Sequence, residues 1–199
     1  LEKTMLKEKN RESATFEINP NLNQKLTSNP FISYRKVEPE IINDLYKMNS
    51  TKLDETPDIR YGNGRCSDYE LFENNYPSLK RVEEDLTNIM MQAVKSEVFI
   101  MESFFNILRK GSGLTSHRHL NNFDKFLRLD IQKYSLTYYL SVGDQACSEP
   151  GILTLENPIK KILPSEGTIV IFPASRWHSA VYGGNIDRLM IGINFYSLI

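Results

Sequence analysis

The second half of the chain contains five short segments that are rich in β-branched and aromatic residues, and clusters of Pro, Gly and Asn separate them. Short segments of this composition, bounded by turn residues, are typical of the strands of a sandwich or barrel. They predict strands at residues 97–108, 134–142, 151–155, 167–172 and 188–196. The sequence therefore predicts a mainly β fold with helices, whose core is a jelly roll or a similar barrel.

Two helices are predicted ahead of these strands. Apolar residues fall on one helical face between Glu40 and Met48, and they recur at helical spacing from Ser78 to about Lys95. The hydroxyl of Ser78 is predicted to cap the first N–H groups of the longer helix. An apolar stripe of this kind usually faces the protein's own core, so we expect an N-terminal helical layer on the sheet and not a partner-binding surface.

The chain is predicted to hold one domain with a polar arm before it. Residues 1–30 are polar and interrupted by Asn, Ser and Pro, which is typical of a segment with little structure of its own. Residues 31–199 are expected to form the domain, with helical support over 31–96 and the barrel core over 97–199. Residues 54–75 are predicted to be loop. The chain begins with Leu1 and not Met, as in a trimmed chain or in one domain of a longer protein.

Charge and cysteine content narrow the choice of partners and compartment. The 24 basic and 25 acidic residues nearly cancel, so the net charge of −1 does not indicate binding to nucleic acid or to an anionic membrane. No apolar run approaches the length of a membrane span, and the first residues lack the pattern of a secretion signal. Cys66 and Cys147 lie far apart and cannot form a disulfide framework, which favours a reducing, cytoplasmic setting.

Three histidines are the candidate metal ligands. His117 and His119 stand two residues apart, so in an extended segment both imidazoles project from the same side. His178 follows a predicted strand and a turn. Any one histidine in a chain of this length is usually an ordinary surface or core residue. Nitrogen donors that converge from two segments nevertheless predict a metal site.

Arg188 opens the last predicted strand, ten residues after His178, and its neighbours in that strand are mostly apolar. A guanidinium in that position is expected to be partly buried, where it requires an anionic partner, and its planar fork fits a carboxylate. Two interpretations remain open. Arg188 binds the carboxylate of a ligand, or it forms a structural salt bridge with Asp187 or a nearby glutamate.

These residues belong to a longer series of motifs. A His-x-His pair is followed by Tyr138-Tyr139-Leu140, by a Gly-x-Leu-x-Leu strand from Gly151, by Gly-x-x-x-x-Phe-Pro-x-x-x-x-His ending at His178, and by Arg188. The series, which covers Phe104–Tyr196, resembles the 2-oxoglutarate and Fe(II)-dependent oxygenase superfamily. It is most similar to the phage and bacterial oxygenases with a His-x-His pair, some of which are attached to tetratricopeptide repeats.

The resemblance implies a double-stranded β-helix that holds Fe(II), and a hydroxylase that uses 2-oxoglutarate and dioxygen and releases succinate and carbon dioxide. His117 would be the first iron ligand and His178 the distal one. Arg188 would pair with the C5 carboxylate of 2-oxoglutarate, and Tyr139 would hydrogen-bond the same carboxylate. A barrel-lining role for Tyr139, with its hydroxyl bonded to backbone, is an equally open interpretation. The substrate is expected to be a small molecule or a peptide.

Two features depart from the resemblance. Most of the superfamily has Asp or Glu two residues after the first histidine, and this chain has His119. Either three histidines hold the iron, which the spacing of His119 favours, or a carboxylate arrives from elsewhere, with Asp124 and Asp130 the nearest candidates. The segment Leu120–Lys133 is longer than expected and mixes aromatic with basic residues. It is either a solvated insertion or a lid over the iron.

Two other functions remain open on the sequence. A three-histidine site on a jelly roll also suits a cupin-type dioxygenase that needs no 2-oxoglutarate, in which Arg188 would be structural or would bind the substrate's own carboxylate. The chain could instead be a non-catalytic jelly-roll binding module, with His119 as a sign of lost catalysis. Succinate formation supports the first function, oxygen uptake without succinate supports the cupin type, and binding without turnover supports the module.

Overall fold

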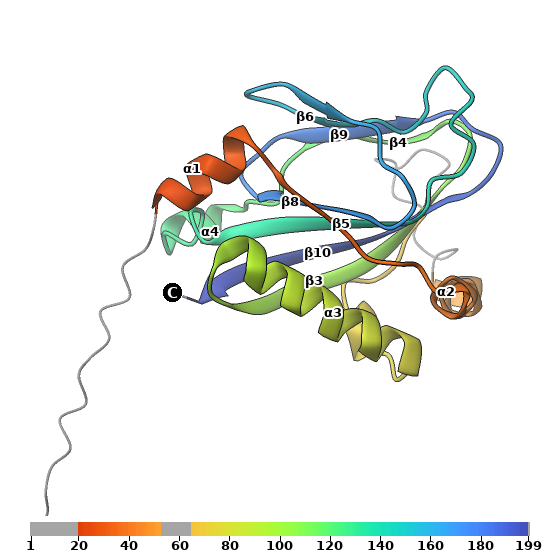
Figure 1. Ribbon diagram of the computed structural model, residues 1–199, viewed down its shortest axis with the longest axis horizontal. Coiled ribbons are helices and arrows are strands. Elements are labelled where there is room, and N and C mark those ends of the chain that lie inside the picture. Colours follow the sequence, from red (N-terminus) through yellow and green to blue (C-terminus); the bar gives the residue numbers. More distant parts are fainter. Residues whose placement is uncertain (1–19, 53–64, 199) are drawn as a thin grey trace, which may run out of the picture.

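The computed structural model describes residues 20–52 and 65–198, and two antiparallel sheets form most of it (Figure 1). The large sheet has the strand order β1-β8-β5-β10-β3-β2, and the small sheet has the order β4-β9-β6-β7. The strands are β1 (Phe31–Tyr34), β2 (Arg65–Cys66), β3 (Glu97–Leu108), β4 (Ser112–His117), β5 (Lys133–Ser141), β6 (Leu153–Leu155), β7 (Lys160–Ile162), β8 (Thr168–Pro173), β9 (His178–Tyr182) and β10 (Arg188–Leu198). The helices are α1 (Pro20–Ser28), α2 (Pro39–Lys52), α3 (Pro77–Val94) and α4 (Asn122–Phe126), with one 3-10 turn, η2 (Leu71–Glu73).

The long central strands of the large sheet are buried on both faces, so their side chains alternate between two cores. In β10, Ile191 and Phe195 pack in the core beneath the helices, while Met190 packs in the core between the sheets. Side chains along a strand alternate with a period of two, and burial on both faces explains why β10 is almost continuously apolar. The face between the sheets is the one that carries the candidate site.

Helix α3 covers the opposite face of the large sheet, away from the small sheet (Figure 1). Its buried residues recur every three or four positions, as the sequence predicts; they include Leu79, Val82, Leu86, Met90 and Val94. The predicted cap is wrong, because the helix begins at Pro77 and Tyr76 occupies the cap position without a side-chain bond. Proline suits the first helical position, since its missing N–H would have no partner there. The hydroxyl of Ser78 instead donates to the Asp44 carboxylate on α2 at 2.6 Å and ties the two helices together.

The five predicted strands are present as β3, β5, β6, β8 and β10, and both predicted helices are present as α2 and α3. Strands β4, β7 and β9 of the small sheet were not predicted as strands, apart from the extended geometry assumed around His117. They are short and half-exposed in places, so their apolar patterns are weak. None of the helices in residues 20–52 and 65–198 is long and apolar enough to cross a membrane.

The structure differs from the sequence-based expectation on the N-terminal side. Residues 20–28, predicted as part of an arm, form α1, and β1 then pairs with β8. The predicted loop 54–75 contains β2, which pairs with β3, and the turn η2. Residues 1–19 of the predicted arm and residues 54–64 of the predicted loop lie outside the described residues. The partners of these short elements are distant strands, which a local sequence pattern does not reveal.

Candidate metal centre

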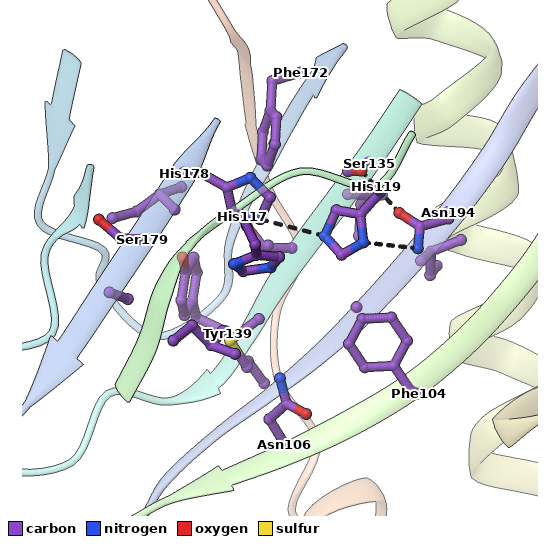
Figure 2. Close-up of a pocket in the computed structure, with 18 residues that line it drawn as sticks. Phe104, Asn106, His117, His119, Ser135, Tyr139, Phe172, His178, Ser179 and Asn194 are labelled. Carbon is purple, nitrogen blue, oxygen red and sulfur yellow. Dashed lines mark hydrogen bonds between the residues drawn. The ribbon is translucent and has the colours of Figure 1, made fainter. Parts of the chain in front are cut away.

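Three imidazoles converge at one end of the space between the sheets. His117 is the last residue of β4 and His178 the first of β9, and the two are register partners in the small sheet. His119 lies two residues past β4, where its backbone N–H donates to the Ala174 carbonyl at 3.0 Å. One ring nitrogen from each histidine lies within 4.8 Å of the others, and Figure 2 shows the rings turned toward one another. The structure thus brings together the three histidines that the sequence singled out.

Backbone carbonyls orient two of these rings. The Nδ1 atom of His117 lies 2.7 Å from the Thr115 carbonyl oxygen, and that of His178 lies 3.1 Å from the Arg176 carbonyl oxygen. A carbonyl oxygen only accepts, so each Nδ1 carries the proton and each Nε2 presents its lone pair to the cluster. Protein metal sites commonly use this arrangement, in which the second ring nitrogen is fixed by a backbone or carboxylate oxygen. His117 and His178 therefore have the form that can bind a metal ion.

The protonation state of His178 fits the same role. Its side chain is only 4% exposed. This burial lowers the pKa of His178 to about 3, with the nearby His117 adding to the effect and the Arg176 carbonyl opposing it. The ring is therefore neutral at physiological pH, and a neutral imidazole is what a metal ion requires.

The carboxylate candidates Asp124 and Asp130 lie outside the cluster, because the ligand group found among the described residues consists of the three histidines. Asp124 is buried and fully engaged elsewhere: it accepts from Lys133 Nζ at 3.0 Å, from the Tyr196 hydroxyl at 2.6 Å and from the Asn121 N–H at 2.9 Å. Burial alone would raise the pKa of Asp124, but these hydrogen bonds outweigh it and hold the pKa below its usual range. Asp124 is a structural ion-pair partner in this fold.

The longer segment Leu120–Lys133 contains α4, whose first turn is closed by reciprocal bonds between Asn121 and Asp124. Its aromatic side chains point to solvent, with Phe123 66% and Phe126 81% exposed. None of its residues lines the cavity beside the histidines or a second hollow that adjoins His117 and His119. In this structure the segment does not act as a lid over the cluster.

A cavity extends from the histidines between the two sheets. Its lining comes mainly from the inward faces of the large sheet and of β9; the residues include Phe104, Asn106, Leu114, Ser135, Thr137, Tyr139, Leu153, Phe172, Ser179, Met190, Gly192 and Asn194. Most of this surface is apolar, so the few polar side chains in it stand out. Apolar cavities with a few convergent polar groups are typical of small-molecule sites.

Arg188 lies beside this cavity and is 1% exposed. Its guanidinium carbon is 4.9 Å from the centre of the Tyr139 ring, and Tyr139 lines the cavity. None of its three guanidinium nitrogens has a hydrogen-bond partner among the described residues. Burial lowers the pKa of Arg188, which Tyr139 and Tyr182 oppose, yet an arginine stays charged in proteins.

The structural salt bridge considered for Arg188 is absent from the described residues, because Asp187 pairs with Arg109 at 3.0 Å and accepts from Tyr46. An unpaired buried charge is costly, so this guanidinium indicates a site for an anion.

Two further buried polar residues at the cavity, Asn106 and Thr137, were not predicted from the sequence. Asn106 and Thr137 both line the cavity, and neither the two polar amide atoms of Asn106 nor the hydroxyl of Thr137 has a hydrogen-bond partner in the described part of the chain. Polar residues inside the apolar runs of β3 and β5 are the sequence signal that would have revealed them.

No protein-family model matches the chain, and no curated protein sequence matches it. Solved structures do match. HygX from Streptomyces hygroscopicus, with nickel, 2-oxoglutarate and hygromycin B bound, is 12% identical with a TM-score of 0.63, over 89% of this chain and 87% of that chain. A prolyl-4-hydroxylase from Pseudomonas putida is 14% identical with a TM-score of 0.62, over 90% of this chain and 99% of that chain. A prolyl hydroxylase from Trichoplax adhaerens, in complex with a hypoxia inducible factor peptide, is 14% identical with a TM-score of 0.62, over 89% of each chain.

These matches identify the fold as the double-stranded β-helix of the 2-oxoglutarate and Fe(II)-dependent oxygenases. The fold class predicted from the sequence is confirmed, as is the resemblance to this superfamily at the level of the fold. The narrower resemblance to oxygenases with a His-x-His pair stays a prediction.

Proposed function

We propose that the protein is an Fe(II)- and 2-oxoglutarate-dependent oxygenase that hydroxylates a small molecule or a peptide and releases succinate and carbon dioxide. The observation that carries this proposal is the buried, unpaired guanidinium of Arg188 beside a cavity that ends at three histidines. A ligand with a carboxylate at one end and a metal-chelating group at the other would satisfy both ends of that cavity. 2-Oxoglutarate has this form, and it is bound in the fold neighbour HygX.

The donor atoms fit a divalent metal ion. His117 and His178 present neutral Nε2 atoms from two adjacent strands of one sheet, which holds them rigidly. Imidazole is a good ligand for iron, and an incomplete protein ligand set leaves positions for co-substrate and dioxygen. When bound, iron with 2-oxoglutarate and dioxygen would supply the oxidation that inserts an oxygen atom into a C–H bond.

The chain itself would bind and orient the co-substrate. The Arg188 fork would hold the distal carboxylate through two charge-assisted hydrogen bonds, and the Tyr139 hydroxyl would add a third. Asn106 and Thr137 offer unpaired donors and acceptors in the same region, so they would fix the remaining orientation. The apolar lining of the cavity would keep water away from the reacting atoms.

Two fold neighbours and a second hollow beside the histidines bear on the class of substrate. One fold neighbour is in complex with a peptide and another has hygromycin B bound, so the fold accommodates both kinds of ligand. The second hollow has an aromatic wall from Tyr69 and Phe104, and Arg118 lies at its rim. This hollow is the candidate entrance for the substrate, because it adjoins His117 and His119.

Calorimetric titration of 2-oxoglutarate into the Fe(II)-loaded protein under anaerobic conditions tests the proposal. We expect binding that depends on the metal and that is lost in Arg188→Met, followed by slow succinate formation on admitting oxygen without a substrate. A folded, metal-loaded protein that does not bind 2-oxoglutarate would contradict the proposal.

The three-histidine cluster is the observation that favours the cupin-type alternative, a dioxygenase without 2-oxoglutarate in which Arg188 binds the substrate's carboxylate. Oxygen consumption that requires the metal and a carboxylate substrate, with no succinate formed, would support this alternative. Binding of 2-oxoglutarate or of a substrate with no turnover would support the non-catalytic module.

A further inference from the structure

His119 differs from the other two histidines in what its Nδ1 atom faces. His117 and His178 direct Nδ1 at backbone carbonyl oxygens. The Nδ1 atom of His119 lies 3.2 Å from the side-chain amide nitrogen of Asn194, on β10 (Figure 2). The amide nitrogen of Asn194 is a potential hydrogen-bond donor, whereas the two carbonyl oxygens can only accept. The three rings therefore cannot all have the same tautomer.

The amide of Asn194 is oriented by a carboxylate. Its nitrogen lies 2.6 Å from Oε2 of Glu102, and its oxygen accepts from the Ser135 hydroxyl at 2.8 Å. Glu102 and Asn194 are register partners on β3 and β10, and Asn194 is 1% exposed. A rotated amide would set its carbonyl oxygen against the carboxylate oxygen at this short distance. Glu102 thus keeps the N–H groups of Asn194 directed toward itself and toward His119.

The hydrogen-bond pattern then fixes His119. Because the Asn194 amide donates to Nδ1, a neutral His119 ring carries its single proton on Nε2. A second contact agrees with this assignment: Nε2 of His119 lies 3.3 Å from Nε2 of His178. His178 donates through Nδ1 to the Arg176 carbonyl, so in the metal-free protein its Nε2 accepts and His119 is the donor of the pair. A metal ion on Nε2 of His178 would replace this contact, whereas the contact between His119 and Asn194 would remain. Both nitrogens of His119 have partners that require the Nε2–H tautomer.

We propose that Glu102 and Asn194 are positioning residues that hold His119 as an Nε2–H donor, so that a metal ion here is bound by His117 and His178 and not by His119. The part about the metal rests on the proposed function, whereas the tautomer does not. To bind through Nε2, His119 would move its proton to Nδ1, where an N–H would face the N–H of Asn194. The proposal assigns two ligands and one hydrogen-bond donor where the sequence predicts three histidine ligands, a prediction that the NMR and Co²⁺ experiments below test.

Nitrogen-15 NMR of the imidazoles in the metal-free full chain reads the tautomers directly, at a pH where the rings are neutral. We expect Nδ1–H for His117 and His178 and Nε2–H for His119, whose signals are assigned by their loss in His119→Gln. The double variant Glu102→Gln/Asn194→Asp exchanges carboxylate and amide, so His119 should switch to Nδ1–H. The single variant Glu102→Gln removes the carboxylate that orients the Asn194 amide, so His119 should then show both tautomers, and an unchanged Nε2–H signal would mean that Glu102 does not position His119. An Nδ1–H signal for His119 in the parent protein would overturn the proposal, whatever the variants do.

Binding of Co²⁺ supplies the second readout. His119→Ala should raise the dissociation constant clearly less than His117→Ala does, which removes a ligand and should raise it by at least about tenfold. In the exchanged double variant, loss of His119 should cost about as much as loss of His117. Equal losses for His119→Ala and His117→Ala in the parent background would overturn the proposal. Absence of Co²⁺ binding in the parent would contradict the proposed function, and the NMR result would still decide the tautomer.

Discussion

His117 and His178 are register partners on β4 and β9, so the pairing of two strands in the small sheet sets the separation of their imidazoles. Each ring is also fixed through Nδ1 by a carbonyl of its own chain segment. We therefore expect the two strands to keep their positions if a metal ion binds to these imidazoles. The two imidazoles are preorganised, because rigid strands and hydrogen bonds to backbone carbonyls hold them in place.

His178→Ala should lower the affinity for Fe(II) by at least about tenfold, because it removes a neutral, rigidly held nitrogen donor. Metal analysis after dialysis measures the effect. Trp177→Leu, which changes the exposed neighbour of His178, is the control and should keep the parent's iron content. Full iron occupancy in a folded His178→Ala protein would remove this residue from the site.

Arg188→Met should weaken binding of 2-oxoglutarate by about 2–5 kcal/mol, the range found when one partner of a buried, hydrogen-bonded charge pair is truncated. The affinity for the metal should hardly change. Isothermal titration with the metal-loaded variant gives both values. Arg109→Leu is the matched control, because Arg109 is an exposed arginine paired with Asp187 near the same strand end. Equal 2-oxoglutarate affinities in the two variants would make Arg188 a structural residue.

The same Arg188→Met change should leave the ligand-free protein as stable as the parent, or more stable by up to about 1–4 kcal/mol, the gain seen when buried ionic groups are replaced by apolar ones. In the parent, none of the residues 20–52 and 65–198 gives the buried Arg188 charge a hydrogen-bond partner, and the variant carries no charge there. Urea denaturation without ligands measures the difference in the free energy of unfolding. A clearly less stable variant would show that the guanidinium stabilises the fold, in contrast to the expectation.

Gly151→Ala should weaken 2-oxoglutarate binding without affecting the metal. Gly151 has a φ of +80°, which side chains rarely adopt, and a Cβ there would overlap the Nη1 atom of Arg188. The guanidinium would have to move from its place against the Gly151 backbone. Gly183→Ala is the control: its new Cβ would meet the Glu149 Cβ at 3.3 Å, a tight contact that a small shift of that side chain can relieve, and it does not meet Arg188. Unchanged 2-oxoglutarate affinity in folded Gly151→Ala would mean that Arg188 can shift without consequence.

Asp124→Asn should destabilise the protein by about 3–5 kcal/mol at neutral pH, because it leaves the buried Lys133 ammonium without its counter-charge. The folded pKa of Asp124 is lowered, so its contribution to stability is complete above the ordinary pKa of about 3.9 and is lost as the pH falls through the folded value. The difference between parent and variant should therefore narrow in acid. Denaturation curves at several pH values measure it, and Asp124→Asn/Lys133→Met should recover much of the loss. A difference that does not vary with pH would contradict this account.

Much of the fold follows from local patterns, because buried strands and an amphipathic helix have strong periodicities. The limits of β3 match the prediction at both ends, and α3 begins one residue before the predicted start. The elements that were missed, α1, β2 and β4 among them, are short and depend on partners far along the chain. Their stability comes from tertiary contacts, which a single sequence does not contain.

The residues of the candidate site could be predicted where their type is rare in the chain or unusual for their surroundings. Three histidines and a charged residue in an apolar strand are conspicuous, and the structure brings them to one cavity wall and its edge. The hydrogen bonds that surround these residues could not be predicted from the sequence. Nothing in the sequence says that Asn194 lies against His119, or that Asp124 is engaged by Lys133 and Tyr196. These contacts decide what the conspicuous residues can do.

Strand β10 carries Arg188 at one end and Asn194 six positions later, and the period of two sends both to the side that faces the small sheet. Ile191 and Phe195 occupy the alternate positions and fill the helix-side core. A single-residue deletion within β10 would invert this assignment for every residue beyond it, placing polar groups among the helices and apolar ones at the cavity. The same alternation of side chains along β10 thus places the apolar residues of the helix-side core and the polar residues of the candidate site. Substitutions can change individual side chains in β10, but an insertion or deletion would disrupt both the core and the candidate site.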